Sequence, residues 1–568
     1  MRLSRSACAL VLLLPACAGP QPSGVPSEWK FAGKSIVTDA PNAVVVSGSP
    51  IASRVGRDIL QAGGNAVDAA VAVGFALAVV HPEAGNIGGG GFMLYRAAEG
   101  AVYALDYREM APSGASRNMY LEPDGNPSDL SVTGALAAAV PGSPAGMLEM
   151  HRRFGRLPIA KVMNPAIELA NQGYVVDSFR YQSIGAEMSR LYLFPASRAQ
   201  FLPNNQPPQP GTTLVQRDLG RTLERIRDQG APGFYTGTTA DLIVAEMERS
   251  GGLITHADLA AYKVFWRDPI VIPYRGDTVY SMPPASSGGT TMGMILNMME
   301  GYDPLPPFGS PQLMHLEAEA MARAFMDRNA YMGDPGFVHN PVAQLLSKSY
   351  AAERRATIDP RRATPMTELR PGLKDGPSTT HYSIVDAEGN AVSITTTLNN
   401  SYGSAVTVTG AGFLLNDEMD DLASAPGRPN MYGLVQGDSN AIQPGKRPLS
   451  AMTPSMVVGP DGKLMMVVGT PGGPRIITMV YHVISNVVDH KMTLSDAVAA
   501  PRLHDQGLPN QIRVERGGVP PASLAALRKM GHEVVEGGYT GDVEAIIRTP
   551  TGWQGVSDPR YGGGGSGY

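Results

Sequence analysis

The pattern of hydrophobic and polar residues predicts a β-hairpin in the last third of the chain. Residues 380–386 and 390–398 are both rich in aromatic and β-branched types, and the sequence Asp386-Ala387-Glu388-Gly389-Asn390 joins them. This connection is predicted to be a three-residue loop, a type I turn followed by Gly389 in the left-handed region. Asp386 then faces Asn390, and the same register places Thr379 opposite Thr397 on one face of the sheet. Two hydroxyl groups are therefore expected to meet where a strand begins, although threonine pairs in strands are usually structural.

A long apolar stretch nearer the N-terminus predicts a buried helix. Residues 66–80 are almost wholly apolar and carry one charge, Asp68. The stretch is too short to span a membrane. Asn65 is a suitable N-cap, and His81-Pro82 is expected to end the helix.

Helical patterns also dominate residues 137–260. Residues 240–250 are amphipathic, with Thr238 or Thr239 as a candidate cap. Two further helices are predicted at 290–300, where the methionines suit a hydrophobic core, and at 315–332. The charged residues of the last helix are expected to face solvent; they are Glu317, Glu319, Arg323, Asp327 and Arg328.

A second hairpin is predicted from residues 456–458 and 464–468, which flank Pro460-Asp461-Gly462. It leads into Gly469-Thr470-Pro471-Gly472-Gly473-Pro474-Arg475. Adjacent glycines after a strand can point backbone N–H groups at one position, which is how an oxyanion hole is made. This loop is therefore a candidate catalytic element.

Composition indicates a large folded protein and excludes several kinds of site. The 568 residues are 43% hydrophobic and 17% charged, with a net charge of -5. No basic stripe suggests nucleic acid. Both cysteines, Cys8 and Cys17, lie at the N-terminus, so the rest of the chain has no disulfide framework and no cysteine nucleophile. No His, Asp or Glu cluster has metal-ligand spacing, so neither a catalytic metal nor a cofactor is expected.

Residues 1–18 are predicted to be a secretory signal peptide. Arg2 and Arg5 precede an apolar run over residues 7–14, and cleavage after Ala18 would satisfy the small-x-small rule. Leu14-Pro15-Ala16-Cys17 also resembles a bacterial lipoprotein box with Cys17 as the lipidated residue. Both alternatives stay open, and both imply a periplasmic or secreted location.

Two segments in the first part of the chain are candidates for a site. The run from Gly88 to Gly91 leads into a strand and has no following Lys-Ser/Thr, so it indicates close backbone approach rather than nucleotide binding. Arg108 follows a predicted strand and could bind a carboxylate by a two-pronged contact. The alternative for Arg108 is an ion pair with Asp106 or Glu109.

Two segments after the first hairpin add further candidates. Four acids occur among residues 417–421, without the ligand pattern of a calcium loop. They are expected either to receive a substrate ammonium group or to form an exposed acidic turn. Residues 426–446 form a long polar stretch with Tyr432 in its first half, which is typical of a functional lid.

Together these segments resemble the γ-glutamyltransferase (γ-glutamyl transpeptidase) family of N-terminal-nucleophile hydrolases. Seven blocks occur in the family's order: 88–91, 106–112, 282–289, 379–383, 416–421, 447–454 and 469–475. The resemblance implies an α+β fold, a four-layer αββα sandwich. It also implies a precursor that cuts itself between Ser378 and Thr379, giving a large subunit of residues 19–378 and a small subunit of residues 379–568.

The resemblance also implies the chemistry of the site. The hydroxyl of Thr379 is a weak nucleophile that needs a nearby base. Cleavage supplies one, because the freed α-amino group titrates at about 7.7–8.0. By motif, Thr397 orients the hydroxyl, and Gly472 and Gly473 form the oxyanion hole.

The family's substrate-binding roles fall on five more residues. Arg108 and Ser450 match the residues that hold the glutamyl α-carboxylate, and Asn399, Glu418 and Asp421 match those that receive its ammonium group. Opposite charges are thus expected at the two ends of the pocket. Ala451 departs from the family pattern, which has a second serine there, and this is expected to weaken glutamyl binding by about 1 kcal/mol or to broaden specificity.

The sequence therefore predicts a γ-glutamyltransferase and glutathione hydrolase. Thr379 would form a γ-glutamyl ester that water hydrolyses or that passes to an amino acid or peptide. The nearest alternative is a cephalosporin or glutaryl acylase on the same fold, which would not need Asp421 for an ammonium group. A non-catalytic secreted binding protein is the alternative from another class, and it would persist as one uncut chain.

Overall fold

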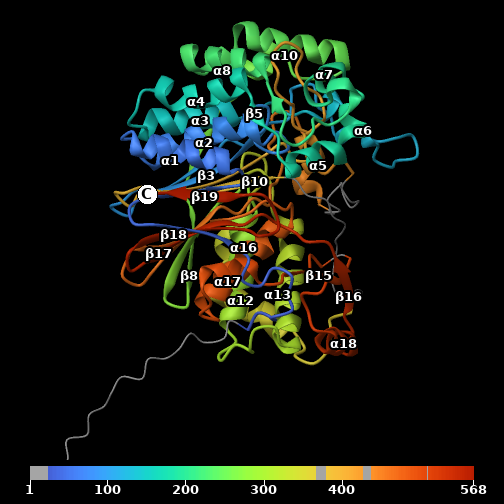
Figure 1. Ribbon diagram of the computed structural model, residues 1–568. Coiled ribbons are helices and arrows are strands. Elements are labelled where there is room, and N and C mark those ends of the chain that lie inside the picture. The colour runs from blue at the N-terminus through green and yellow to red at the C-terminus, as the bar shows by residue number, and fades with distance from the viewer. Residues whose placement is uncertain (1–23, 366–378, 426–435, 508) are drawn as a thin grey trace, which may run out of the picture.

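The computed structural model describes residues 24–365, 379–425, 436–507 and 509–568. Two seven-stranded sheets pack face to face, and a layer of helices covers each outer face (Figure 1). The predicted four-layer αββα sandwich is confirmed.

The first sheet is antiparallel throughout and contains the predicted hairpin. Its strands, in spatial order, are β19 (Gly564–Gly567), β2 (Val44–Ser47), β10 (Thr380–Val385), β11 (Ala391–Thr397), β3 (Gly90–Arg96), β4 (Val102–Asp106) and β7 (Phe265–Arg267).

The second sheet is also antiparallel. Its strands are β1 (Ile36–Ala40), β18 (Gly552–Ser557), β17 (Glu544–Thr549), β13 (Leu464–Gly469), β12 (Ser455–Val458), β9 (Asp277–Ser281) and β8 (Ile270–Tyr274). Segments on both sides of residue 379 therefore contribute to both large sheets. Two small sheets complete the set: β14 (Leu503–His504), β15 (Gln511–Glu515) and β16 (Glu533–Gly537), and β5 (Tyr174–Val175) with β6 (Thr213–Leu214).

The helices that cover the first sheet all come from the N-terminal half of the chain (Figure 1). They are α1 (Pro50–Gln61), α2 (Ala66–Val80), α3 (Ser143–Phe154), α4 (Ile159–Gln172), α5 (Ser178–Ala186), α6 (Met188–Leu191), α7 (Pro195–Phe201), α8 (Arg217–Gln229), α9 (Pro232–Tyr235), α10 (Gly237–Ser250) and α11 (His256–Ala261).

The helices on the other side of the sandwich come from the middle and the end of the chain. They are α12 (Gly288–Glu300), α13 (Pro311–Tyr331), α14 (Val342–Leu345), α15 (Lys348–Ala356), α16 (Arg475–Val488), α17 (Leu494–Ala499) and α18 (Pro521–Lys529). In the ranges that the structure covers, no helix is both long and apolar enough to cross a lipid bilayer.

The sandwich has one hydrophobic core on each side of the first sheet. In β2, Val45 packs with the core under the first helical layer, whereas Val44 and Val46 pack with the core between and below the sheets. This alternation follows from the period of two in a strand, and it explains why a strand buried on both faces is apolar throughout.

Most predicted elements are present with shifted ends. The helix at 66–80 is fully buried, and the Asn65 side chain accepts hydrogen bonds from the backbone N–H groups of Val67 and Asp68. The predicted cap of α10 is wrong, because that helix begins earlier, after Thr236. The hairpin at 456–468 is confirmed as β12 and β13.

The prediction that the charges of α13 face solvent is wrong. Its charged residues Glu317, Glu319, Arg323, Asp327 and Arg328 are all buried. Some of them form ion pairs, Arg323 with Glu319 on the same helix (2.5 Å) and Asp327 with Arg354 of α15 (3.1 Å). Helix α13 is thus an interior helix with buried charges.

Candidate active site

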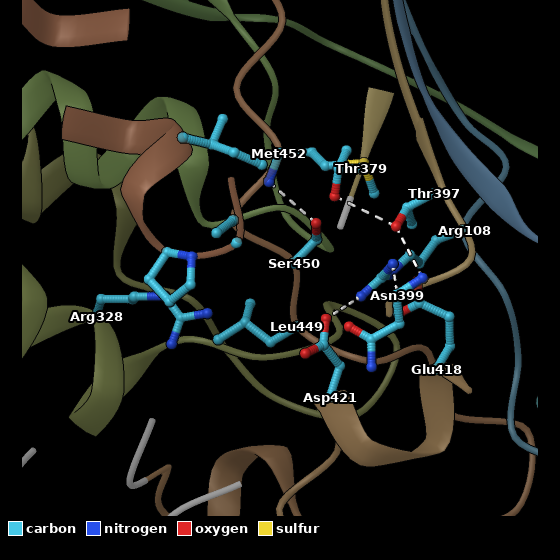
Figure 2. Close-up of a pocket in the computed structure, with 14 residues that line it drawn as sticks. Arg108, Arg328, Thr379, Thr397, Asn399, Glu418, Asp421, Leu449, Ser450 and Met452 are labelled. Carbon is cyan, nitrogen blue, oxygen red and sulfur yellow. Dashed lines mark hydrogen bonds and ion pairs between the residues drawn. The ribbon is translucent and has the colours of Figure 1, made fainter. Parts of the chain in front are cut away.

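A small pocket lies where β10 begins and β11 ends (Figure 2). Eight of the residues predicted from sequence line it together: Arg108, Thr379, Thr397, Asn399, Glu418, Asp421, Ser450 and Gly473. The remaining lining residues are Arg328, Leu449, Ala451, Met452, Pro474 and Ile476. Residues separated by more than three hundred positions in the chain thus meet at the predicted hydroxyl pair.

The two threonine hydroxyls are in contact. In the β10–β11 ladder Thr380 pairs with Thr396 and Val385 with Ala391, which is the register predicted from the hairpin loop. Gly389 has φ +90°, as that loop requires. The Thr379 hydroxyl donates to the Thr397 hydroxyl oxygen at 3.3 Å, and the Asn399 backbone N–H donates to the same oxygen at 2.8 Å. The buried Thr397 hydroxyl therefore holds the half-buried Thr379 hydroxyl in one orientation.

The glycine run after α2 positions the end of β11. A Cβ atom at Gly89 would lie 2.0 Å from the Thr397 carbonyl oxygen, so no larger residue fits there. The Asn86 side-chain amide donates to the same carbonyl at 2.8 Å. The close backbone approach predicted for residues 88–91 is confirmed, and it fixes the strand end that carries Thr397.

The second glycine pair lies between β13 and α16. Gly472 has φ +143° and Gly473 has φ +56°, conformations that favour glycine. A Cβ atom at Gly472 would lie 2.4 Å from the Met479 methyl carbon. Among the described residues, no carbonyl accepts a hydrogen bond from either glycine N–H. Because Gly473 lines the pocket with Thr379, the loop can offer donors to an oxygen next to the Thr379 hydroxyl.

Arg108 is the centre of a buried charge cluster. Its Nη1 lies 2.7 Å from Glu418 and 3.4 Å from Glu109, and its Nη2 lies 2.5 Å from Asp421. The Arg108 Nε–H also donates to the Pro448 carbonyl oxygen at 3.2 Å. Opposite charges were expected at the two ends of the pocket, but in this structure they are in direct contact.

Burial controls protonation in this cluster. It raises the pKa of Glu418 well above its ordinary value, despite the opposing charge of Arg108. It also raises the pKa of Asp421, and it raises that of Glu109 to about 7. The alternative of an exposed acidic turn is wrong for these residues, because Glu418 is buried and only 14% of the Asp421 side chain is exposed.

Asn399 and Ser450 complete the polar lining. Asn399 adopts φ +77°, and its side-chain amide donates to the Asp417 carbonyl at 3.0 Å. The Ser450 hydroxyl accepts from the Met452 backbone N–H at 3.0 Å. Ala451, beside it, presents only a methyl group to the pocket.

Arg328 is the pocket residue that sequence reasoning missed. The sequence predicts a solvated helix face for it, yet it is fully buried and reaches the pocket from α13 (Figure 2). A sequence signal did exist, because the charges of α13 do not segregate to one helical face and so do not fit a surface helix.

Several predicted features lie outside the described residues. These are the signal segment with Cys17, the Ser378 side of the proposed cleavage bond, and Tyr432 of the proposed lid.

One cluster with metal-ligand spacing was overlooked in the sequence. His315 and Glu319 are one helical turn apart on α13, and His532 joins them. The His315 Nδ1 and His532 Nε2 atoms are 2.7 Å apart, and the other His315 nitrogen contacts the Asp359 carbonyl oxygen. Glu319 is bonded to Arg323 and Thr364. These hydrogen bonds account for the cluster without an ion.

Comparison with known proteins is consistent with this geometry. A family model described as gamma-glutamyltranspeptidase matches residues 52–568. The chain is 48% identical to a glutathione hydrolase proenzyme of Pseudomonas sp. (strain A14), over 89% of each chain. It is 46% identical to the glutathione hydrolase proenzyme of Escherichia coli (strain K12), over 92% of this chain and 91% of that one. It is also 38% identical to the acylase ACY 1 proenzyme of Pseudomonas sp. (strain SE83), over 94% of each.

Solved structures give the same two kinds of relative. A cephalosporin acylase from Bacillus halodurans superposes with a TM-score of 0.82 at 28% identity, covering 96% of this chain and 99% of that one. The gamma-glutamyltranspeptidase of Helicobacter pylori superposes with a TM-score of 0.57 at 45% identity, covering 59% of this chain and 96% of that one.

Proposed function

This chain belongs to the gamma-glutamyltranspeptidase family, and from that premise we propose that it is a γ-glutamyltransferase and glutathione hydrolase with Thr379 as its nucleophile. The single observation that carries the assignment is the Thr379–Thr397 hydroxyl pair at 3.3 Å, in the pocket that also contains Arg108, Asp421 and Gly473. This combination supplies a nucleophile, charged groups for an amino-acid head, and backbone donors for an oxyanion.

The first step is cleavage of the precursor. The Thr379 hydroxyl attacks the Ser378 carbonyl carbon, the peptide C–N bond breaks, and the Thr379 nitrogen takes up a proton. Water then hydrolyses the ester and leaves Ser378 as a C-terminus and Thr379 as an N-terminus. The products are a large subunit, residues 19–378, and a small subunit, residues 379–568. The word proenzyme in the names of the relatives supports this order of events.

The freed α-amino group then serves as the base. It takes the proton of the Thr379 hydroxyl as the oxygen attacks the γ-carbonyl carbon of glutathione or another γ-glutamyl compound. Thr397 keeps the attacking oxygen oriented, and the Gly472 and Gly473 N–H groups stabilise the oxyanion. The proton passes from the amine to the leaving nitrogen, and a γ-glutamyl ester remains on Thr379. Water or the amino group of an amino acid or peptide resolves the ester by the same path.

The amino-acid head is held by the charged lining. Arg108 and Ser450 bind the α-carboxylate, while Asn399, Glu418 and Asp421 receive the ammonium group. Because Arg108 contacts the acids directly without a ligand, binding requires the substrate ammonium to take over part of the Arg108 contacts with Glu418 and Asp421. This exchange of partners favours a zwitterionic head over a singly charged one.

An acylase is the second candidate, because an acylase relative and a cephalosporin acylase structure both match the chain. Turnover of γ-glutamyl and glutaryl p-nitroanilide separates the two, since the glutaryl compound lacks only the amino group. We expect the γ-glutamyl compound to be preferred by wild type, and Asp421→Asn to reduce that preference. Equal turnover of both compounds by wild type would overturn the γ-glutamyl assignment.

Location and processing at the N-terminus follow from sequence. A leader cleaved after Ala18 would release the chain into the periplasm or the medium, whereas use of the lipoprotein box would cut before Cys17 and leave it as the lipidated first residue. Labelling cells with a radioactive fatty acid distinguishes the two, because Cys17→Ser abolishes label only in the anchored case.

A further inference from the structure

Arg328 is a buried cation in the pocket that has no charge partner among the described residues. It lies on α13, reaches the pocket beside Leu449, and is fully shielded from solvent (Figure 2). Its Nε–H donates to the Ser287 hydroxyl and its Nη1–H to the Asn329 side-chain oxygen, both at 2.8 Å. Its Nη2 atom is buried and has no hydrogen-bond partner in residues 24–365, 379–425, 436–507 and 509–568. In the part of the chain that the structure covers, no carboxylate lies within 4.0 Å of Arg328.

Arg108 differs from Arg328 in its surroundings. Three carboxyl groups lie within 3.4 Å of Arg108, so its positive charge is already offset. Arg328 is offset only at longer range by Asp421, and burial lowers the pKa of its guanidinium to about 10. Keeping a guanidinium buried without a charge partner is unfavourable. An anion that enters this pocket therefore gains more electrostatic energy beside Arg328 than beside Arg108.

Arg328 is also linked to the segment that lines the carboxylate end of the proposed site. The Ser287 hydroxyl that accepts from Arg328 donates to the Ser450 carbonyl at 2.6 Å, and the Ser287 N–H donates to the same carbonyl at 2.8 Å. Ser450 and Ala451 follow one another along the pocket wall. Because Ala451 offers no side-chain donor, the unused Nη2–H groups of Arg328 are a further source of donors for an anion bound there.

We propose that Arg328 binds the substrate α-carboxylate through Nη2 and is a specificity-determining residue for the acyl group. This rests on the proposed γ-glutamyl function and adds to it a second arginine, which supplies the free positive charge of the site. Arg108 then shares the carboxylate with Arg328 and also keeps Glu418 and Asp421 in place for the ammonium group. The acyl groups that fit are those with a carboxylate four bonds from the reacting carbonyl carbon, such as γ-glutamyl and glutaryl.

Three matched substrates test the proposal: γ-glutamyl, glutaryl and 4-aminobutyryl p-nitroanilide. The glutaryl compound lacks only the amino group, and the 4-aminobutyryl compound lacks only the carboxylate. Arg328→Gln should lower kcat/KM at least about 30-fold for the two carboxylate substrates. It should leave kcat/KM for the 4-aminobutyryl compound almost unchanged. Arg328→Lys, which keeps the charge, should recover part of the loss. An equal loss for all three substrates would overturn the proposal and assign Arg328 a structural role.

A second readout, competitive inhibition, serves if the 4-aminobutyryl compound is turned over too slowly to measure. L-Glutamate and its α-amide, isoglutamine, compete with γ-glutamyl p-nitroanilide and differ only at the α-carboxylate. The ratio of their inhibition constants should fall towards one in Arg328→Gln, and a ratio unchanged from wild type would refute the proposal.

The control is Arg323→Gln, an arginine buried on the same helix but paired with Glu319 outside the pocket. Arg323→Gln should keep the wild-type ratio of the inhibition constants of L-glutamate and isoglutamine, even if it lowers the melting temperature. The wild-type protein distinguishes failure of the proposed function from failure of the Arg328 proposal. If the proposed function is wrong, wild type itself remains uncut or turns over none of the γ-glutamyl compound.

Discussion

Replacing Thr397 with valine removes one hydroxyl and keeps the branched shape of the side chain. The buried Thr397 oxygen accepts two hydrogen bonds, from the Thr379 hydroxyl at 3.3 Å and from the Asn399 N–H at 2.8 Å. The first loss frees the nucleophile to rotate. The second leaves a buried N–H without this acceptor, in a residue that itself lines the pocket. Thr397→Val should therefore affect both stability and catalysis.

The size of the effect follows from the two bonds. A neutral hydrogen bond contributes about 0.5–1.5 kcal/mol, and a buried donor left unsatisfied costs about 1–3 kcal/mol. The free energy of unfolding should fall by about the second amount. If both losses act on the transition state, their sum of about 1.5–4.5 kcal/mol corresponds to a rate about 10- to 2000-fold lower.

The assay measures the rate of precursor cleavage on gels, kcat with γ-glutamyl p-nitroanilide, and the urea midpoint. Thr395→Val is the matched control, because Thr395 lies two residues earlier on the same face of β11 and bonds to His381 at 2.9 Å. It should lose stability to a similar extent and keep both rates. The reasoning is refuted if Thr397→Val cleaves itself and turns over substrate as fast as Thr395→Val.

Three further predictions concern the glycine loop, the charge cluster and pH. Gly472→Ala should lower kcat more than it changes KM and reduce stability by about 1–3 kcal/mol, because its backbone has φ +143° and the Met479 methyl is 2.4 Å from the new Cβ. Gly538→Ala is the control: its new Cβ meets nothing within 4 Å, so kcat and stability should both stay at the wild-type value. Equal kinetics for the two variants would contradict the oxyanion role of Gly472. Arg108→Gln should destabilise the fold by about 3–5 kcal/mol, since it leaves buried carboxyl groups without their cation, and a wild-type urea midpoint would show that the cluster is not held by Arg108. Stability should fall as the pH drops from about 6.5 towards 3, because burial lowers the pKa of His381 to about 3 and the unfolded chain binds the proton first. His381→Gln should make the urea midpoint fall less between pH 7 and pH 4. An unchanged slope of midpoint against pH would exclude His381 as the cause of the fall.

The hairpin register could be derived from sequence because its determinants are local. The period of two in the strands and one glycine in the left-handed region fix which residues face each other. The structure reproduces this pairing from Val385 with Ala391 to Thr380 with Thr396. The contact between Thr379 and Thr397 follows from it directly.

The arrangement of the charges could not be derived in this way. Arg108 and Asp421 are separated by 313 positions, and their contact depends on how loops from different layers meet. The roles assigned by resemblance identified the residues but not their mutual distances. Only the folded chain shows that Arg108 is already paired with acids, whereas Arg328 is not.

The buried face of α13 was missed for a related reason. A charged residue in a helix is usually solvated, and the pairing of Arg323 with Glu319 on one helix also fits an exposed surface. What buries them is packing against α12, α15 and α18, and its local sign in the sequence is that the charges do not segregate to one helical face.

Cleavage before Thr379 is the central claim, and sequencing the N-terminus of the smaller fragment tests it most directly. Purified wild-type protein should give two bands after incubation, the smaller one beginning Thr-Thr-His-Tyr-Ser, while Thr379→Ala should stay as one band without activity. Full activity in an uncut chain, or a fragment that begins at another residue, would contradict the account.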